Sequence, residues 1–289
     1  MRWDNFINKA KNSIVFSDGS MGTLLQSYGL TPDECPEYWN IKHPEIIENI
    51  HRSYIESGSN LIITNTFGGN RIKLSNYKLE NKIKELNEAA VKIAKKVAKN
   101  NVIVAGDIGP TGKFVEPLGD LTFDQMLDIY KEQIEILANA GVDAIIFETH
   151  VDILELKAGI IACKEICDLP IIASVTFEND GRMLTGTSVE AAFTTLEALG
   201  VDIMGTNCGT GPKDMFENIK NKFHIFEIPI IAQANAGLPE VKDNKTVYNT
   251  TPQEFAYYSS KMVENGVSVI GGCCGTTPEF IRILKEKVY

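Results

Sequence analysis

Three of the six cysteines fall in a pattern that suits a metal ion. Cys273 and Cys274 are adjacent, and glycines flank the pair on both sides. Adjacent cysteines bond poorly to each other, because a disulfide needs a Cα separation that a trans peptide does not give. The flanking glycines leave the backbone free to aim both sulfurs at one point. With a third sulfur, the pair would form a catalytic zinc set that leaves one coordination position open for substrate.

A zinc ion held by three thiolates favours one kind of chemistry. Its net negative charge makes it a poor generator of hydroxide, and hydrolytic zinc sites usually contain histidine and carboxylate ligands. A fourth thiol bound there would be held as a thiolate at neutral pH. Because the site is rich in electrons, that sulfur would stay nucleophilic. The cysteine pattern therefore indicates the transfer of an alkyl group to sulfur.

The elements that must position these sulfurs are eight short runs rich in Val and Ile. The runs span residues 14–18, 60–67, 102–107, 143–149, 170–177, 201–208, 229–235 and 267–272. Most open as continuous apolar stretches, as expected of parallel strands covered on both faces. Helical segments lie between most of them, so the sequence predicts an α/β fold, a single-domain (β/α)8 TIM barrel over residues 1–289. The rival, a doubly wound sheet, would carry a Gly-rich phosphate turn that residues 18–23 match poorly.

Helix boundaries support the same repeat. Three threonines begin a capping-box pattern, with Gln or Glu three residues later: Thr122, Thr187 and Thr251. Four glycines just before a run predict helix ends: Gly58, Gly141, Gly200 and Gly266. Three connections are longer than the rest, at about residues 24–43, 110–121 and 237–250. Loops of this kind are expected to build the mouth of the barrel.

Active sites of such barrels lie at the carboxyl ends of the strands. The predicted strand ends carry acids, amides, hydroxyls and sulfurs, namely Asp18, Asn65, Thr66, Asp107, Glu148, Cys208, Asn235, Cys273 and Cys274. Cys208 ends the sixth run and the cysteine pair follows the eighth, so one strand separates them around the barrel. We therefore predict that these three cysteines bind one metal ion.

The remaining cysteines and one histidine are interpreted as structural. Any cysteine is otherwise a small buried hydrophobic residue. Cys163 and Cys167 are four residues apart on one face of a predicted helix and are interpreted as packing residues. Cys35 lies in a Pro-containing loop and is interpreted as structural or incidental. His150 follows Glu148 by two positions, and we interpret it as a polar rim residue rather than a metal ligand.

Two acids at the predicted rim suit a cationic group. Asp18 and Glu148 could bind the ammonium of an amino-acid substrate, and backbone amides near Gly19 and Gly22 could take its carboxylate. The alternative for each acid is a solvated rim residue or a helix cap. If the acids bind substrate, the fourth thiol at the metal belongs to an amino acid.

The overall composition excludes several classes of protein. A formal net charge of -10 over 289 residues argues against a nucleic-acid or anionic membrane surface. Residues 1–13 contain no apolar run, so neither a signal peptide nor an anchor is predicted, and no stretch has the length of a membrane span. Six cysteines without framework spacing predict free thiols and a cytoplasmic location.

Six short motifs combine glycines with polar residues along the chain. They are residues 18–23 (DGSMGT), 64–68 (TNTFG), 106–112 (GDIGPTG), 147–149 (FET), 207–208 (NC) and 271–276 (GGCCGT). In this order, over essentially the whole chain, they resemble the homocysteine S-methyltransferase family, and the last motif is highly specific. Within the family the chain most resembles the N-terminal homocysteine-binding module of cobalamin-dependent methionine synthase, through residues 65–74 and 235–239.

The resemblance implies a function and a ligand set. Zn²⁺ would be bound by Cys208, Cys273 and Cys274, with the homocysteine sulfur as fourth ligand and methionine as product. The methyl donor implied by this branch is methylcobalamin, carried by a separate corrinoid protein or cobalamin domain. The alternative is a sulfonium such as S-methylmethionine.

The resemblance also implies roles for residues around the metal. Asp18 and Glu148 would hold the amino group of homocysteine, and Gly19 would contribute a backbone contact. Three further residues are carried over as mouth residues near substrate or metal: Thr66, Asp107 and Asn235. The chain departs from the family pattern at residues 233–234, which are Gln-Ala where Lys-Pro is expected.

Two functions of other classes stay open from the sequence. The first is an aldolase or isomerase that uses the glycines after the eighth strand to bind phosphate. None of the eight runs contains a lysine, which argues against a Schiff-base aldolase. The second is a non-catalytic zinc-binding subunit, although a purely structural zinc site would be closed.

Overall fold

The computed structural model describes residues 2–100, 102–223, 225–242 and 245–289. In these residues a parallel sheet of eight strands coincides with the eight predicted runs. The strands are β1 (Val15–Phe16), β2 (Leu61–Ile63), β3 (Ile103–Ile108), β4 (Ala144–His150), β5 (Ile171–Val175), β6 (Ile203–Asn207), β7 (Ile230–Ala234) and β10 (Val269–Gly272). β2 is much shorter than its run, because the chain leaves the sheet and the amide of Thr66 bonds back to the carbonyl of Thr64.

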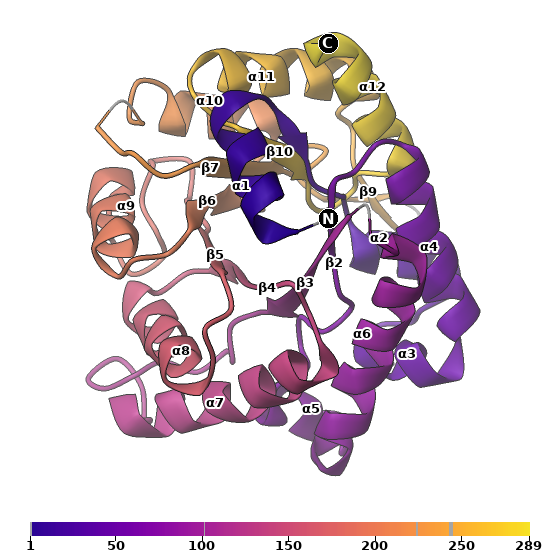
Figure 1. The fold of residues 1–289 in the computed structure, drawn as a ribbon, viewed down its shortest axis with the longest axis vertical. Helices are drawn as coiled ribbons and strands as arrows, with labels where there is room; N and C mark the ends of the chain where they lie inside the picture. The colour runs from indigo at the N-terminus through magenta and orange to yellow at the C-terminus, as the bar shows by residue number, and fades with distance from the viewer. Residues whose placement is uncertain (1, 101, 224, 243–244) are drawn as a thin grey trace.

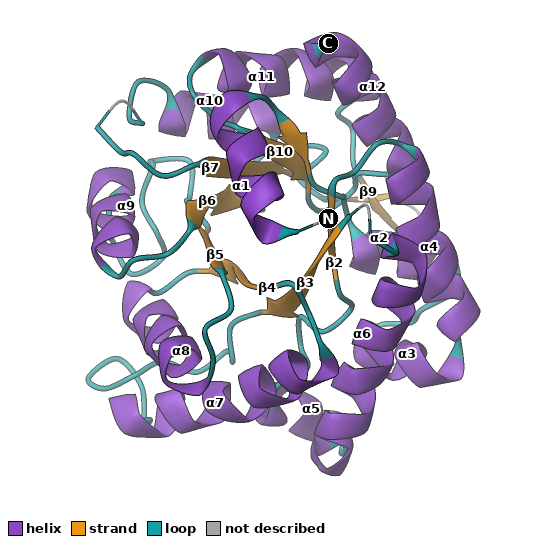
Figure 2. Cartoon of the chain, viewed as in Figure 1, coloured by secondary structure: helices purple, strands orange, loops and turns teal. Residues whose placement is uncertain are grey.

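The strands follow one another around a ring, which Figure 2 shows in orange. Their order is β1-β10-β7-β6-β5-β4-β3-β2. The ring closes between β1 and β2, where Ser17 bridges Leu61 and the amide of Asn60 donates to the carbonyl of Phe16 at 2.7 Å. The carboxylate of Asp18 accepts from the amide of Ile63 at 2.8 Å across the same seam. The predicted (β/α)8 barrel is confirmed.

Helices surround the sheet (Figure 1). The longer ones are α1 (Trp3–Asn12), α4 (Pro44–Glu56), α6 (Ile83–Ala98), α7 (Phe123–Ala140), α8 (Ile153–Ile166), α9 (Val189–Ala198), α10 (Pro212–Ile219), α11 (Pro252–Glu264) and α12 (Pro278–Val288). Shorter ones are α2 (Met21–Ser27), α3 (Trp39–Lys42), α5 (Arg71–Ser75), and the 3-10 helices η1 (Pro36–Tyr38) and η2 (Glu80–Lys82). The main core lies between the outer helices and the sheet. Among the described residues, no helix is both long and apolar enough to cross a bilayer.

The two ends of the barrel differ. Helix α1 lies across one end in Figure 1, and its Phe6 and Ala10 pack against inward-facing strand residues such as Leu61, Ile103 and Val269. These side chains are fully or almost fully buried, so apolar packing closes the barrel at the amino-terminal ends of its strands. The carboxyl ends of the strands lie at the opposite end, where polar side chains replace apolar ones.

Helix boundaries follow most of the sequence signals. Thr122 forms the predicted capping box with Gln125, and the hydroxyl of Thr251 accepts from the amide of Glu254. The capping box predicted at Thr187 is wrong, because Ser188 caps α9 by accepting from the amide of Ala191. The four predicted helix-ending glycines all have positive φ angles: Gly58, Gly141, Gly200 and Gly266.

Two of the three long connections build the mouth of the barrel. Residues 24–43 include η1 and α3, and residues 237–250 include an antiparallel pair that the sequence did not predict, β8 (Glu240–Lys242) with β9 (Lys245–Val247). Both connections supply side chains to the cavity described below. The connection at residues 110–121 follows the carboxyl end of β3 and supplies no described residue to the lining of that cavity. Its Thr111 instead bonds to the buried carboxylate of Glu155.

Candidate active site

A cavity of about 370 Å³ opens at the carboxyl ends of the strands. Eight of the ten residues predicted at the strand ends or from the family resemblance line it: Asp18, Gly19, Asn65, Asp107, Glu148, Cys208, Cys273 and Cys274. Thr66 and Asn235 are buried beside it and are not among its lining residues. None of the lining residues that the structure describes is a Lys, Arg or His. The cavity therefore offers anionic and soft ligands without a basic side chain to bind an anion.

The three predicted cysteine ligands come together in this cavity. Their sulfur atoms all lie within 4.8 Å of one another, and the sulfurs of Cys208 and Cys274 are 4.0 Å apart. Tetrahedral zinc with Zn–S bonds of about 2.3 Å would separate two sulfurs by about 3.8 Å. The strand order places β7 alone between β6 and β10, as predicted. The donor set therefore fits a zinc ion.

The glycines before the cysteine pair are required by close packing. A Cβ atom on Gly271 would lie 1.9 Å from the Oγ of Ser17, and one on Gly272 would lie 2.3 Å from the Oγ1 of Thr276. Their role is therefore to let β10 approach β1 and the following turn. Cys208 has a φ angle of 59°, a left-handed conformation unfavourable for a residue with a side chain.

The protonation of the three sulfurs shows how strongly they interact. Hydrogen bonds from the thiols of Cys273 and Cys274 lower the pKa of Cys208 to about 3. The same bonds to Cys208 raise the pKa of Cys273 and bring that of Cys274 to about 12. One thiolate thus accepts bonds from two thiols. A metal ion would replace those two protons.

Three carboxyl groups line the same cavity as the sulfurs, those of Asp18, Asp107 and Glu148. Burial raises the pKa of Asp18 well above its ordinary value, and the charge of Glu148 raises it further. The hydrogen bond from the Ile63 amide lowers this pKa but does not outweigh burial. Burial and then the charge of Cys208 raise the pKa of Glu148 to about 7, although a hydrogen bond from Asp107 lowers it. Burial and then the charge of Glu148 also raise the pKa of Asp107.

Two oxygens of this group have no partner. Asp18 Oδ1 and Asp107 Oδ1 are buried without a hydrogen bond among the described residues. Buried carboxylate oxygens in this state are satisfied by a bound cation or water. The arrangement therefore suits an ammonium group.

Backbone groups near Gly19 form another wall. Gly19 and Gly22 line the cavity, as expected if their amides face a substrate carboxylate. The neighbouring amides of Ser20 and Thr23 are occupied, because they donate to the Oγ1 of Thr276 and the Oγ of Ser20. Only part of this segment can therefore offer amides to a ligand.

The two predicted residues outside the lining support it. The hydroxyl of Thr66 donates to the carbonyl of Asp107 at 2.7 Å. Asn235 forms a side-chain hydrogen bond that lowers the pKa of Cys208, and its Oδ1 is buried without a partner. Thr66 thus holds the strand end of Asp107, and Asn235 lies at the sulfurs.

Three residues around the cavity were not selected from the sequence. Glu37, on η1, lines the cavity and accepts from the amide of Gly68 at 2.6 Å. Tyr248, after β9, also lines it and bonds to Cys274. Asn207 donates to the sulfur of Cys273 at 3.8 Å. Only Asn207 had a sequence signal, since it belongs to the motif at residues 207–208.

His150 and the other cysteines lie outside the cavity. His150 is fully buried against Tyr130 and Phe147, so its interpretation as a rim residue is wrong. Burial lowers the pKa of His150 to about 4, so the imidazole is neutral. The sulfurs of Cys163 and Cys167 are 3.9 Å apart at the end of α8. The sulfur of Cys35 donates to Glu37, and burial raises the pKa of Cys35 to about 12.

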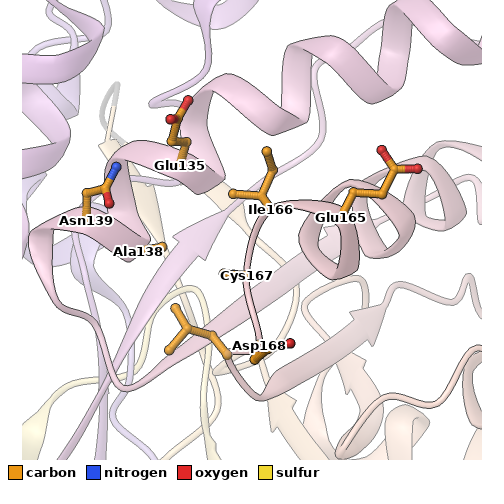
Figure 3. Close-up of a pocket in the computed structure, with 8 residues that line it drawn as sticks. Glu135, Ala138, Asn139, Glu165, Ile166, Cys167 and Asp168 are labelled. Carbon is orange, nitrogen blue, oxygen red and sulfur yellow. The ribbon is translucent and has the colours of Figure 1, made fainter.

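A second hollow, of about 490 Å³, lies where α7 and α8 end and β5 begins (Figure 3). Its lining includes Cys167 and the acids Glu135, Glu165 and Asp168. It adjoins the amino-terminal end of β5, the side of the barrel away from the strand carboxyl ends. In the part of the chain that the structure describes, the three mouth cysteines are the group of His, Cys, Asp or Glu whose ligand atoms converge for a metal.

Comparison with known proteins decides the family. The model of the family described as homocysteine S-methyltransferase matches residues 15–288. The chain belongs to the homocysteine S-methyltransferase family. This confirms the resemblance to the family that the sequence predicted. It also sets aside the phosphate-binding aldolase or isomerase.

Two curated relatives are named methionine synthase. The chain is 37% identical over 287 residues to methionine synthase from Mycobacterium tuberculosis (strain ATCC 25618 / H37Rv), and 36% identical to that from Mycobacterium leprae (strain TN). Each alignment covers 93% of this chain and 24% of the relative. The chain thus spans about a quarter of the length of these relatives.

Solved structures share the fold. The homocysteine methyltransferase MmuM from Escherichia coli, in its metallated form, superposes with a TM-score of 0.80. The two chains are 21% identical, and the superposition covers 96% of this chain and 97% of the other. The barrel is therefore the fold of a known homocysteine methyltransferase.

Proposed function

We propose that residues 1–289 form a zinc-dependent homocysteine-binding barrel that makes methionine. The observation that carries the proposal is the convergence of three sulfurs in one cavity with the carboxyl groups of Asp18 and Glu148. The sulfurs suit a thiol ligand on zinc, and the acids suit an amino group. Homocysteine joins these two groups in one small molecule.

The residues have distinct roles in the proposed mechanism. Cys208, Cys273 and Cys274 would hold Zn²⁺, which when bound would keep the homocysteine sulfur ionised and nucleophilic at neutral pH. Asp18 and Glu148 bind the ammonium, and Asp107 shares a hydrogen bond with Glu148. The amide of Gly19 contacts the carboxylate end. These contacts fix the position of the sulfur, so that the methyl donor has to approach from the cavity mouth.

The methyl transfer itself is a substitution at carbon. The sulfur of homocysteine forms a bond to the methyl carbon, and the bond between that carbon and the donor breaks. The breaking bond leaves its electron pair on the donor, and the product thioether is methionine. Thr66 and Asn235 act through their neighbours, by holding the end of β3 and the sulfur of Cys208.

The proposed donor is methylcobalamin on a corrinoid protein or domain. The relatives named methionine synthase support this choice, since the chain corresponds to 24% of their length and another part can carry the donor. A second candidate is a sulfonium such as S-methylmethionine. The cavity favours a sulfonium donor in one respect. A sulfonium is a cation, and the described lining of the cavity contains four acids and no basic residue. The six free cysteines support a reducing, cytoplasmic location.

The test is a methyl-transfer assay on protein whose metal content has been measured. Homocysteine is offered methylcobalamin in one reaction and S-methylmethionine in another, and methionine is measured in both. Methionine from methylcobalamin alone supports the corrinoid donor, and methionine from S-methylmethionine alone replaces it with the sulfonium. A protein that binds neither zinc nor homocysteine would refute the function, whereas zinc binding without homocysteine binding would indicate a non-catalytic zinc-binding subunit.

A further inference from the structure

The side chain of Asn207 connects the metal site to the end of a neighbouring strand. Asn207 ends β6, is fully buried and directly precedes Cys208. Its Oδ1 accepts from the amide of Thr149 at 2.7 Å. Its Nδ2 donates to the hydroxyl of Thr149 at 2.7 Å and to the sulfur of Cys273 at 3.8 Å. One amide group therefore bonds both to a proposed metal ligand and to the residue after Glu148.

Two residues next to Asn207 have an unfavourable backbone conformation: Cys208, which follows it in the chain, and Thr149, to which it is hydrogen-bonded. Thr149 has a φ angle of 61° and Cys208 has one of 59°, although neither is a glycine. Left-handed residues with side chains persist where the surrounding contacts hold them, and they are common at functional sites. The amide and the hydroxyl of Thr149 both bond to the side chain of Asn207, so this side chain holds the irregular part of β4 that follows Glu148.

We propose that Asn207 is a positioning residue that sets the sulfur of Cys273 and the carboxylate of Glu148 relative to each other. This inference rests on the proposed function, because it takes Cys273 as a zinc ligand and Glu148 as the binder of an ammonium group. Partners in the outer shell of a metal site orient the ligands and tune their charge, and losing one typically costs about 10- to 100-fold in metal affinity. An N–H group directed at a thiolate offsets part of its negative charge.

Substitution of Asn207 by Asp separates the two contacts. The Asp side chain keeps an acceptor for the Thr149 amide, and its second oxygen can accept from the Thr149 hydroxyl. It replaces the N–H group beside Cys273 by a carboxylate oxygen. Asn207→Ala removes both contacts. The two variants therefore test the metal side and the amino-group side separately.

The experiment measures zinc affinity by competition with a chelator, and the binding of 2-aminobutyrate by calorimetry at saturating zinc. 2-Aminobutyrate has the amino and carboxylate groups of homocysteine but no thiol. We expect Asn207→Asp to lower zinc affinity by about 10- to 100-fold and to leave 2-aminobutyrate binding at least as tight as in the wild type. We expect Asn207→Ala to weaken both. In cobalt-loaded protein, Asn207→Asp should move the thiolate-to-cobalt absorption to longer wavelength, because the sulfur loses its donor.

Asn87 provides the matched control. It is a fully buried asparagine on α6 that donates to the carbonyls of Gly69 and Ile83 and does not line the cavity. Asn87→Ala should lower the melting temperature without changing zinc affinity or the cobalt spectrum. If Asn207→Asp binds zinc within about twofold of the wild type and leaves the cobalt spectrum unchanged, Asn207 has only a structural role and the inference is refuted.

The outcome of Cys273→Ala separates this inference from the proposed function. If Cys273→Ala abolishes zinc binding and Asn207→Asp does not alter it, the function stands and the inference fails. If Cys273→Ala keeps full zinc affinity, the proposed metal site itself is wrong. Both failures are visible in the same chelator competition.

Discussion

Two groups of cysteines in this barrel have similar sulfur distances and different surroundings. Cys208 and Cys274 are 4.0 Å apart at the carboxyl ends of the strands, and Cys163 and Cys167 are 3.9 Å apart at the end of α8. The first pair has a third sulfur within 4.8 Å and lies in a cavity with acids. Cys163 is buried in the main core among apolar residues. Sulfur proximity alone therefore does not make a metal site.

Protonation separates the two groups in the same way. Hydrogen bonds from two thiols lower the pKa of Cys208 to about 3, so a thiolate is present at neutral pH. Burial raises the pKa of Cys163 far above its ordinary value. Since metals bind the thiolate form, Cys208 offers a thiolate to a metal ion and Cys163 does not.

Removal of single sulfurs gives the largest expected effect. Cys208→Ala, Cys273→Ala and Cys274→Ala should each lower zinc affinity by at least about 100-fold, because about 10–16 kcal/mol of binding free energy is shared among few ligands in such sites. Methyl transfer should be lost with the zinc. Metal analysis after dialysis measures the first effect. Cys167→Ala is the control and should keep both zinc affinity and methyl transfer. An active, zinc-free variant at Cys208, Cys273 or Cys274 would refute their assignment as zinc ligands.

Removal of one acid should affect substrate and leave the metal in place. Glu148→Gln should weaken homocysteine binding by about 10- to 100-fold, since a hydrogen bond to a charged group contributes about 1.5–3 kcal/mol. Zinc content should not change. Glu165→Gln, beside the α8 cysteines, is the matched control and should bind homocysteine as the wild type does. Equal homocysteine affinity in Glu148→Gln and wild type would contradict the ammonium role.

The pH dependence of amino-acid binding should follow the ionisation of Glu148. Burial raises the pKa of Glu148 to about 7, so its carboxyl is largely protonated at pH 6 and ionised at pH 8. An ammonium ligand requires the ionised form, and 2-aminobutyrate affinity should therefore rise about tenfold from pH 6 to pH 8. Calorimetry on zinc-free protein measures the rise, because a bound metal ion would offset the Cys208 charge that helps to raise this pKa. In Glu148→Gln the affinity should stay flat over this range, and the same rise in that variant would assign it to another group.

The smallest expected effect concerns the tyrosine at the mouth. Tyr248 bonds to Cys274. Its ring packs closely against Gly275, where an added Cβ atom would lie 2.2 Å from the ring. Tyr248→Phe should lower zinc affinity by about 2- to 10-fold, because it removes one hydrogen bond of about 0.5–1.5 kcal/mol and keeps the ring. Tyr257→Phe, on the exposed side of α11, should have no effect. Identical zinc affinities in wild type and Tyr248→Phe would remove this tyrosine from the metal site.

The amino-acid sequence by itself determined the strands, the family and the proposed zinc ligands. Continuous Val/Ile runs indicate buried parallel strands, and the glycines before them mark the ends of the helices that connect these strands. Together they predict a parallel barrel. The cysteine pair is adjacent in the chain, and Cys208 follows a recognisable strand. Such signals are local, so the sequence displays them directly.

Tertiary structure decided which side chains surround those ligands. Glu37 and Tyr248 reach the cavity from long connections whose path depends on packing, and His150 is buried because β4 continues past Glu148. The contact of Asn207 with Cys273 joins residues 66 positions apart. Hydrogen bonds of this kind and the pKa values of buried acids depend on distances across the closed barrel. No sequence spacing encodes these distances, because they exist only when all eight strands have met.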